Sequence, residues 1–296
     1  MFATLLGDLP RPPLPPDATP HDLVYFALEA QATAGLEPLT DGGLWGGALD
    51  DDPVERWRAT AALTNRAVKA IVPGPYSAVE PGDDDDERLA AAADATNATL
   101  RGLASAGCLL AEVHEPRAAE VGTDPDARRR FITTTRRALD GVTGMHRSLA
   151  IVGANADAAG IDTVLAAPWD SLALDLVDGP DNWRLAAAAP GHIGIVCGAL
   201  GAGERADESV EVLLFAIGYA ASTGGRGHDR VGIATAGSLQ GVSWDVAVRR
   251  MRVLGEAARL ATATPDERAA TLDPRAVSIR GAAMGRGGIL RARREG

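Results

Sequence analysis

The chain has 296 residues, of which 46% are hydrophobic, so it can bury a large core in one domain or two. Its formal net charge is −11, and without a basic face we expect no nucleic-acid partner. No apolar stretch is long enough to span a bilayer, and no signal-peptide pattern opens the sequence, so we expect a cytoplasmic protein with no membrane partner. Cys108 and Cys197 lie far apart, which favours a reducing compartment and excludes an all-cysteine zinc site.

Short apolar segments alternate with helical segments along the chain. The predicted strands are 2–6, 37–40, 68–72, 109–116, 148–152, 171–176, 192–197 and 230–235. The predicted helices are 21–34, a segment within 50–67, 83–106, 125–139, 161–166, 181–188, 209–223 and 242–262.

Eight such units predict an α/β fold with a single (β/α)8 TIM barrel over residues 1–264 and a partly ordered tail over 265–296. An open doubly wound sheet is the alternative. The sequence GALGAG after the seventh predicted strand is only a partial glycine pattern, which is weak support for dinucleotide binding.

The segment 109–117, LLAEVHEPR, ends an apolar strand in a cluster of ionisable side chains. Side chains alternate along a strand, so Glu112 and His114 share one face and Glu115 takes the other. A carboxylate beside an imidazole at a strand end can share or relay a proton. The alternative is a salt-bridged strand end at the surface.

Barrel enzymes build their sites at the carboxyl ends of the strands. The polar and aromatic side chains that we expect there, besides His114, Glu112 and Glu115, are those of Asp8, Arg11, Asp41, Trp45, Tyr76, Ser77 and Asp175. Trp45 lies between glycines in a loop and is a candidate for stacking on a ligand, while Arg11 or Tyr76 could bind an anionic or folate-like group. Lys69, on the third predicted strand, could form a buried ion pair or a Schiff base.

The strand-end motifs and their order resemble one family. The motifs are LLGDLPRP, AGLEPLTDGG, PGPYS, AEVHEP and HIGIVCGALGAGERADESVE, and together they span roughly residues 1–262. They resemble the C-terminal catalytic domain of cobalamin-independent methionine synthase, in the superfamily that also holds uroporphyrinogen decarboxylase. The resemblance implies a (β/α)8 barrel whose relatives move a methyl group from a folate or corrinoid donor onto a thiol held by zinc.

The zinc ligands of that family are not matched here. The family pattern has a His-x-Cys pair on the fifth strand, a Glu closing the sixth and a Cys after the eighth, because zinc holds a thiolate as the nucleophile. The matching positions carry Ala150, Val152, Asp175 and Gly237. A shifted alignment offers His146, Ser148 and Asp175 as an alternative metal set. We otherwise expect no metal site.

Two further positions depart from the family pattern. The second strand closes with Gly42 and Gly43, then Leu44 and Trp45, where the family has a Glu and an Arg. His114 replaces the Asp that binds the substrate amino group in the family, so amino-acid recognition is not carried over.

The leading expectation is therefore a divergent methyltransferase-family enzyme that acts on a small polar substrate, with catalytic His114, Glu115 and Asp175 and a degenerate zinc site. A metal-free lyase or decarboxylase and a non-catalytic small-molecule-binding relative are the alternatives. A folate-type methyl donor is possible, no other cofactor is implied, and assembly into a homo-oligomer is left open.

Overall fold

The computed structural model describes residues 1–49, 52–80, 86–204, 209–264, 266–268 and 272. Within this part of the chain, seven strands form one parallel sheet in the order β1-β7-β6-β5-β4-β3-β2. The strands are β1 (Phe2–Thr4), β2 (Ala70–Pro73), β3 (Leu110–His114), β4 (His146–Ile151), β5 (Ser171–Asp175), β6 (Gly194–Leu200) and β7 (Val231–Thr235). The helices are α1 (Pro20–Thr33), α2 (Pro53–Ala61), α3 (Asp86–Ser105), α4 (Pro125–Leu139), α5 (Ile161–Val164), α6 (Asn182–Ala188), α7 (Val210–Ser222) and α8 (Trp244–Ala261).

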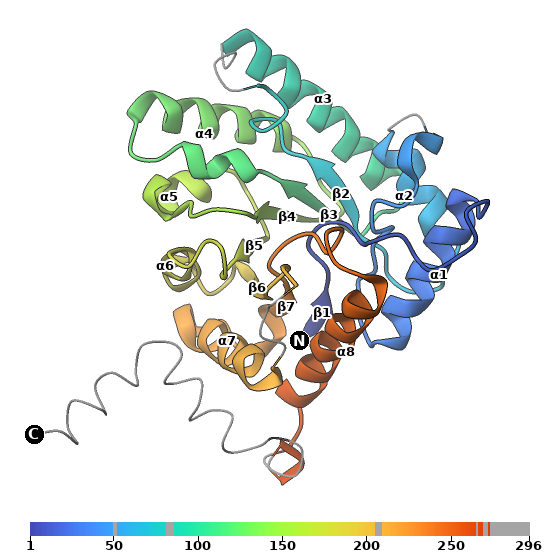
Figure 1. Cartoon of the computed structure of the whole chain (residues 1–296). Helices are drawn as coiled ribbons and strands as arrows, with labels where there is room; N and C mark the ends of the chain where they lie inside the picture. Colours follow the sequence, from blue (N-terminus) through green and yellow to red (C-terminus); the bar gives the residue numbers. More distant parts are fainter. Residues whose placement is uncertain (50–51, 81–85, 205–208, 265, 269–271, 273–296) are drawn as a thin grey trace, which may run out of the picture.

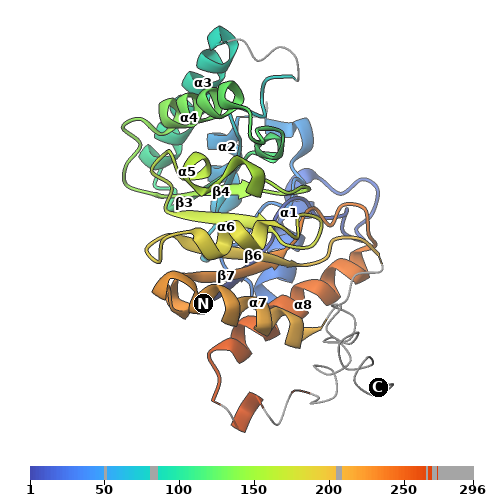
Figure 2. The ribbon, with the colours of Figure 1, turned by 90° about the vertical axis from the view of Figure 1, so that its left-hand side faces the viewer.

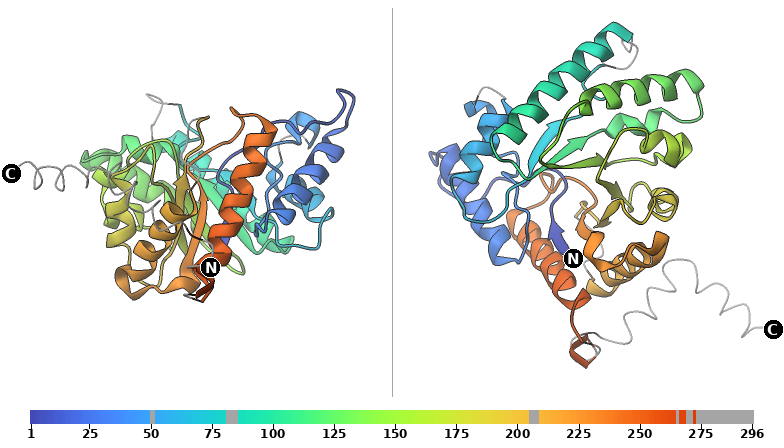
Figure 3. Two further views of the ribbon diagram at one scale, coloured as in Figure 1. Left: turned by 60° about the horizontal axis from the view of Figure 1, so that its bottom comes forward. Right: turned by 180° about the vertical axis from the view of Figure 1, so that it is seen from behind.

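The sheet is curled, and the helices surround it on the outside (Figure 1). The right panel of Figure 3 shows the same ring from behind, and Figure 2 shows α4 to α7 following one another along one side. Each predicted helix matches a helix of the structure to within a few residues, although the predicted start of α3 lies outside the described residues. No described helix is long and apolar enough to cross a membrane.

Local sequence signals explain where several helices begin. Thr19 caps α1 in a capping box, in which its hydroxyl accepts from the Asp22 N–H and the Asp22 carboxylate accepts from the Thr19 N–H. The Asp124 side chain caps α4 by accepting from the Asp126 N–H, and a proline occupies the first turn of both helices, where a missing N–H costs nothing.

The predicted strand 37–40 is the main correction to the expected eight-stranded closed barrel. Glu37 N–H donates to Ala3 O on β1 at 2.9 Å, and Leu39 exchanges backbone hydrogen bonds with Ala67 and Lys69 beside β2. The segment therefore lies between the two edge strands, but it makes only one isolated bridge, Leu39 with Val68. Pro38 has no N–H to donate, which interrupts a ladder at this point.

Two layers of buried side chains line the sheet. The outer layer packs beneath the helices and includes large side chains such as Leu149, Leu172, Ile195 and Ile233. The inner layer is a separate cluster of mostly small side chains, formed by Leu6, Ala150, Ala173, Val196 and Ala234. Small inward-facing residues leave room inside the curled sheet. The predicted tail, 265–296, lies almost entirely outside the described residues.

Candidate functional site

Three ionisable side chains form a hydrogen-bonded chain across β2 and β3. Lys69, just before β2, places Nζ 2.7 Å from Glu112 Oε2 and also donates to Leu5 O at 2.7 Å. The other oxygen of Glu112 lies 2.8 Å from His114 Nε2. Lys69 and Glu112 are almost fully buried, whereas the His114 side chain keeps 17% of its surface exposed. The shared face of Glu112 and His114 and the ion-pair alternative for Lys69 are therefore both confirmed.

This arrangement keeps Glu112 ionised. Burial alone raises the pKa of Glu112, but the positive charge of Lys69 and the hydrogen bond to His114 outweigh burial and lower the pKa to about 2. A buried carboxylate that is held by a lysine on one side fixes the orientation of the imidazole on the other side.

His114 faces a cavity of about 550 Å³ at the carboxyl end of β2 and β3. The side chains with polar groups that line this cavity with it are those of Asp8, Asp41, Arg56, Trp57, Thr60, Lys69 and Ser77. Asp41 pairs with Arg56 at 3.1 Å and accepts from the Gly43 N–H. Burial raises the pKa of Asp8, and the negative charge of Asp41 raises it further. The cavity wall thus offers carboxylate acceptors and an imidazole, which suits a polar ligand with several hydroxyl or amino donors.

Glu115 does not line this cavity. Its two oxygens accept hydrogen bonds from the backbone N–H groups of Tyr76 and Ser77, at 3.0 and 2.8 Å, and its side chain is fully buried. Burial raises the pKa of Glu115 to about 7, although the hydrogen bonds from Ser77 and Tyr76 act in the opposite direction. Gly74 makes room for this carboxyl, since a Cβ there would lie 2.2 Å from Glu115 Cδ. Glu115 holds the loop 74–77 and is not positioned to orient His114.

Asp175 and Arg11 also have local structural roles. Asp175 accepts from the N–H groups of Gly153, Val177 and Asp178 at 2.9–3.0 Å, so it holds the loops that follow β4 and β5. Arg11 is exposed and donates to the carbonyls of its own proline-rich loop, at Pro15 and Pro16. Neither side chain lines the cavity at His114.

The two aromatic candidates are buried. The Trp45 indole donates to Thr60 Oγ1 at 2.9 Å, which places Trp45 in the packing between its loop and α2. Tyr76 packs edge-on against Phe131, with the Arg117 guanidinium over its ring. The sequence suggested stacking surfaces for a ligand, but Trp45 and Tyr76 do not line the cavity at His114.

The residues present do not fit the zinc site of the resembled family. Ala150 is a buried apolar residue of β4, and Asp175 is engaged by three backbone donors. The shifted set fails as well, because His146 begins β4, at the opposite end of the sheet from Asp175, and bonds Ser171 Oγ at 2.8 Å. Among the described residues, no group of three His, Cys, Asp or Glu side chains is placed to hold a metal ion.

Comparison with known proteins shows the fold. No protein-family model matches the sequence, and a comparison with curated proteins finds no significant match. A B12-independent methionine synthase from Shewanella sp. W3-18-1, solved in complex with selenomethionine, is similar at a TM-score of 0.74 and 14% identity, over 87% of this chain and 96% of that one. A protein from Listeria monocytogenes, provisionally named a vitamin B12-independent methionine synthase, is similar at a TM-score of 0.67 and 14% identity. The match covers 88% of this chain and 96% of that one.

A sugar epimerase also shares the fold. D-psicose 3-epimerase from Clostridium cellulolyticum H10, solved with D-tagatose, gives a TM-score of 0.54 at 11% identity, over 89% of this chain and 100% of that one. These likenesses establish a TIM-barrel-like fold related to that of methionine synthase structures. At such identities they do not assign an activity.

Sequence reasoning missed two residues that line the cavity at His114. Arg56 and Trp57 both lie on α2 and reach the cavity from the side. Arg56 neutralises Asp41, and the Trp57 indole donates to Val68 O at 3.0 Å. No motif marks either residue, because their positions depend on how α2 packs beside β2.

Proposed function

We propose that this protein is an enzyme that uses His114 as a general acid–base on a small, hydroxyl-bearing substrate. The observation that carries the proposal is the chain Lys69–Glu112–His114, which joins a buried ion pair to a partly exposed imidazole facing a polar cavity. Glu112 is a positioning residue, and His114 is the group that would touch the substrate.

The chemistry follows from the geometry. Nε2 of His114 is engaged by Glu112, so proton transfer to and from a substrate falls to Nδ1. When the ring takes a proton, the adjacent carboxylate compensates the new charge at 2.8 Å. Asp8 and Asp41 would accept hydrogen bonds from substrate hydroxyl groups in the same cavity. The reaction class is abstraction of a proton from a carbon next to a carbonyl group.

Solvent deuterium exchange tests this proposal. The protein is incubated in D2O with a panel of small hydroxy-ketones, hydroxy acids and amino alcohols, and deuterium incorporation is read by mass spectrometry. We expect exchange into at least one compound, with a loss of about 10²–10⁴-fold in His114→Gln, which is the typical contribution of a positioned general base. His146→Gln is the matched control, because His146 belongs to the other end of the sheet.

A parallel assay distinguishes acid–base catalysis from methyl transfer. The likeness to methionine synthase structures supports methyltransferase ancestry, so 5-methyltetrahydrofolate and a thiol acceptor are assayed in parallel. Thiol methylation without deuterium exchange would replace the acid–base proposal by methyl transfer. Exchange that survives His114→Gln, or no exchange in any compound, would also contradict the acid–base proposal.

A further inference from the structure

A second cavity, of about 830 Å³, lies at the amino end of the sheet. Its lining includes the first residues of several strands, among them Phe2, Leu110 and His146, so it opens on the side opposite to His114. Glu112 lines this cavity, and Lys69 lines both cavities. Trp57 and Val68 also line both cavities, so the two spaces share a wall that includes Lys69.

The cavity exists because three adjacent strands present small side chains inward at one level. Ser148, Ser171 and Gly194 are direct partners in the register of β4, β5 and β6. Each is followed in sequence by a large aliphatic residue of the outer layer. TIM-barrel interiors are usually filled by bulky branched side chains, so this row of small residues leaves a space that other barrels close.

Two residues of the lining each have a buried polar atom without a hydrogen-bond partner among the described residues. These atoms are Oγ of Ser148 and Nε1 of Trp169, whose residues are 2% and 3% exposed. Leaving such a group unsatisfied is costly, so native proteins rarely tolerate it without a ligand or water in reach. The neighbouring Ser171 hydroxyl, by contrast, is already bonded to His146.

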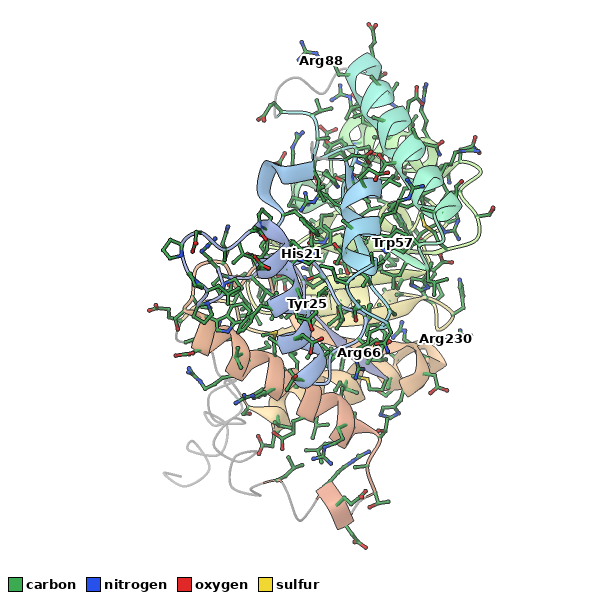
Figure 4. All side chains as sticks on the ribbon, turned by 90° about the vertical axis from the view of Figure 1, so that its right-hand side faces the viewer. His21, Tyr25, Trp57, Arg66, Arg88 and Arg230 are labelled. Atoms are coloured by element: carbon green, nitrogen blue, oxygen red, sulfur yellow. The ribbon has the colours of Figure 1, made fainter. Side chains whose placement is uncertain are left out.

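The rest of the wall is largely apolar. Phe2, Ile193 and Val196 contribute aliphatic and aromatic surface. Charged residues also line the cavity, with Arg66 paired to Glu37 at 3.3 Å and Arg230 donating to a backbone carbonyl. Figure 4 labels Trp57, Arg66 and Arg230, which reach this cavity from α2, from the turn before β2 and from the turn before β7.

We propose that the amino-end cavity is a second small-molecule site, which takes a compact apolar or aromatic compound bearing a hydroxyl oxygen. The oxygen would exchange a hydrogen bond with the Ser148 hydroxyl, and the carbon body would lie against the apolar wall. Its size is within the range of cavities that hold small ligands. The site shares Lys69 and Glu112 with the acid–base centre as part of its wall, but its occupation does not depend on the proposed activity.

The test uses two probes that differ only in a hydroxyl group, 2-naphthol and naphthalene, with equilibrium dialysis of the full chain. We expect 2-naphthol to bind with a 1:1 stoichiometry and more tightly than naphthalene. Ser148→Ala removes the hydroxyl, so the affinity for 2-naphthol should fall about three- to tenfold, which is the effect of one hydrogen bond. The affinity for naphthalene should not change. Ser105→Ala, an exposed serine at the end of α3, is the matched control.

A cavity-filling variant locates the site. Ser148→Leu should abolish binding of both probes, while Asp41→Asn, in the carboxyl-end cavity, should leave binding unchanged. The absence of saturable binding to the wild type would overturn the proposal. It would also be overturned if 2-naphthol bound Ser148→Ala as tightly as it binds the wild type. If Ser148→Leu does not fold, the Ser148→Ala comparison decides by itself. None of these readouts requires turnover, so a failure here is distinct from a failure at His114.

Discussion

Lys69 Nζ lies 2.7 Å from Glu112 Oε2 in a part of the protein from which water is almost completely excluded. Each of the two charges compensates the desolvation cost of the other, so removing one leaves the other as a buried and uncompensated charge. The pair connects β2 to β3 and, through the second oxygen of Glu112, determines how His114 is held.

Lys69→Met should therefore destabilise the protein by about 3–5 kcal/mol, because Glu112 is left as a buried charge without its oppositely charged partner. Urea unfolding at neutral pH measures this change. The double variant Lys69→Met with Glu112→Gln removes both charges, so its loss of stability should be well below the sum of the two single losses. Additive losses would contradict the pairing.

The raised pKa of Glu115 gives a pH dependence of stability with a defined sign. The folded-state pKa of about 7 is above the ordinary value of 4.5, so between these values the folded state binds the proton that the unfolded state has released. Stability should fall as pH rises from 4.5 to 7, by up to roughly 3 kcal/mol for a shift of this size. Urea unfolding across this window should show the fall in the wild type and a smaller one in Glu115→Gln. An identical slope in both proteins would contradict the assignment.

Gly74→Ala should destabilise the loop that Glu115 holds. The new Cβ would lie 2.2 Å from Glu115 Cδ, which forces the carboxyl or the loop to move and places the variant among the strongly destabilised ones, at about 2–4 kcal/mol. Gly47→Ala is the control, because a Cβ there meets nothing within 4 Å. Thermal unfolding of the two variants should separate them by several degrees. Equal stability would show that the loop has room that the structure does not show.

Trp45→Phe should lower stability without affecting the site at His114. The variant removes the indole hydrogen bond to Thr60 and some buried surface, which together contribute about 1–2 kcal/mol. Deuterium exchange into the best compound of the panel should keep the wild-type rate. A large fall in that rate would restore Trp45 as a ligand-binding residue.

The sequence predicted much of this fold because most of its signals are local. Alternation along β3 predicted that Glu112 and His114 share one face, and the pattern of apolar residues along the chain predicted the helices. The prediction of a strand at 37–40 was wrong because Pro38 lacks the N–H that a ladder requires, while the segment still occupies the position between β1 and β2.

The site was less predictable because it depends on distant pairs. Whether Glu115 faces His114 or the loop 74–77 depends on the absence of a side chain at Gly74, 41 positions away in the sequence. The burial of Trp45 depends on Thr60 in α2, and the presence of Arg56 depends on the packing of that helix. These relationships follow from tertiary packing, which no motif records.

The placement of the Lys69–Glu112–His114 chain on strands also makes the scaffold suitable for engineering. Loops at the carboxyl end, such as 41–49, can be exchanged for loops of other length and composition without removing the buried pair that holds the imidazole. A library that varies only these loops would keep His114 and its buried support constant while it samples new shapes of the cavity. Under the proposed function, chemistry and recognition would then reside in separable parts of the chain.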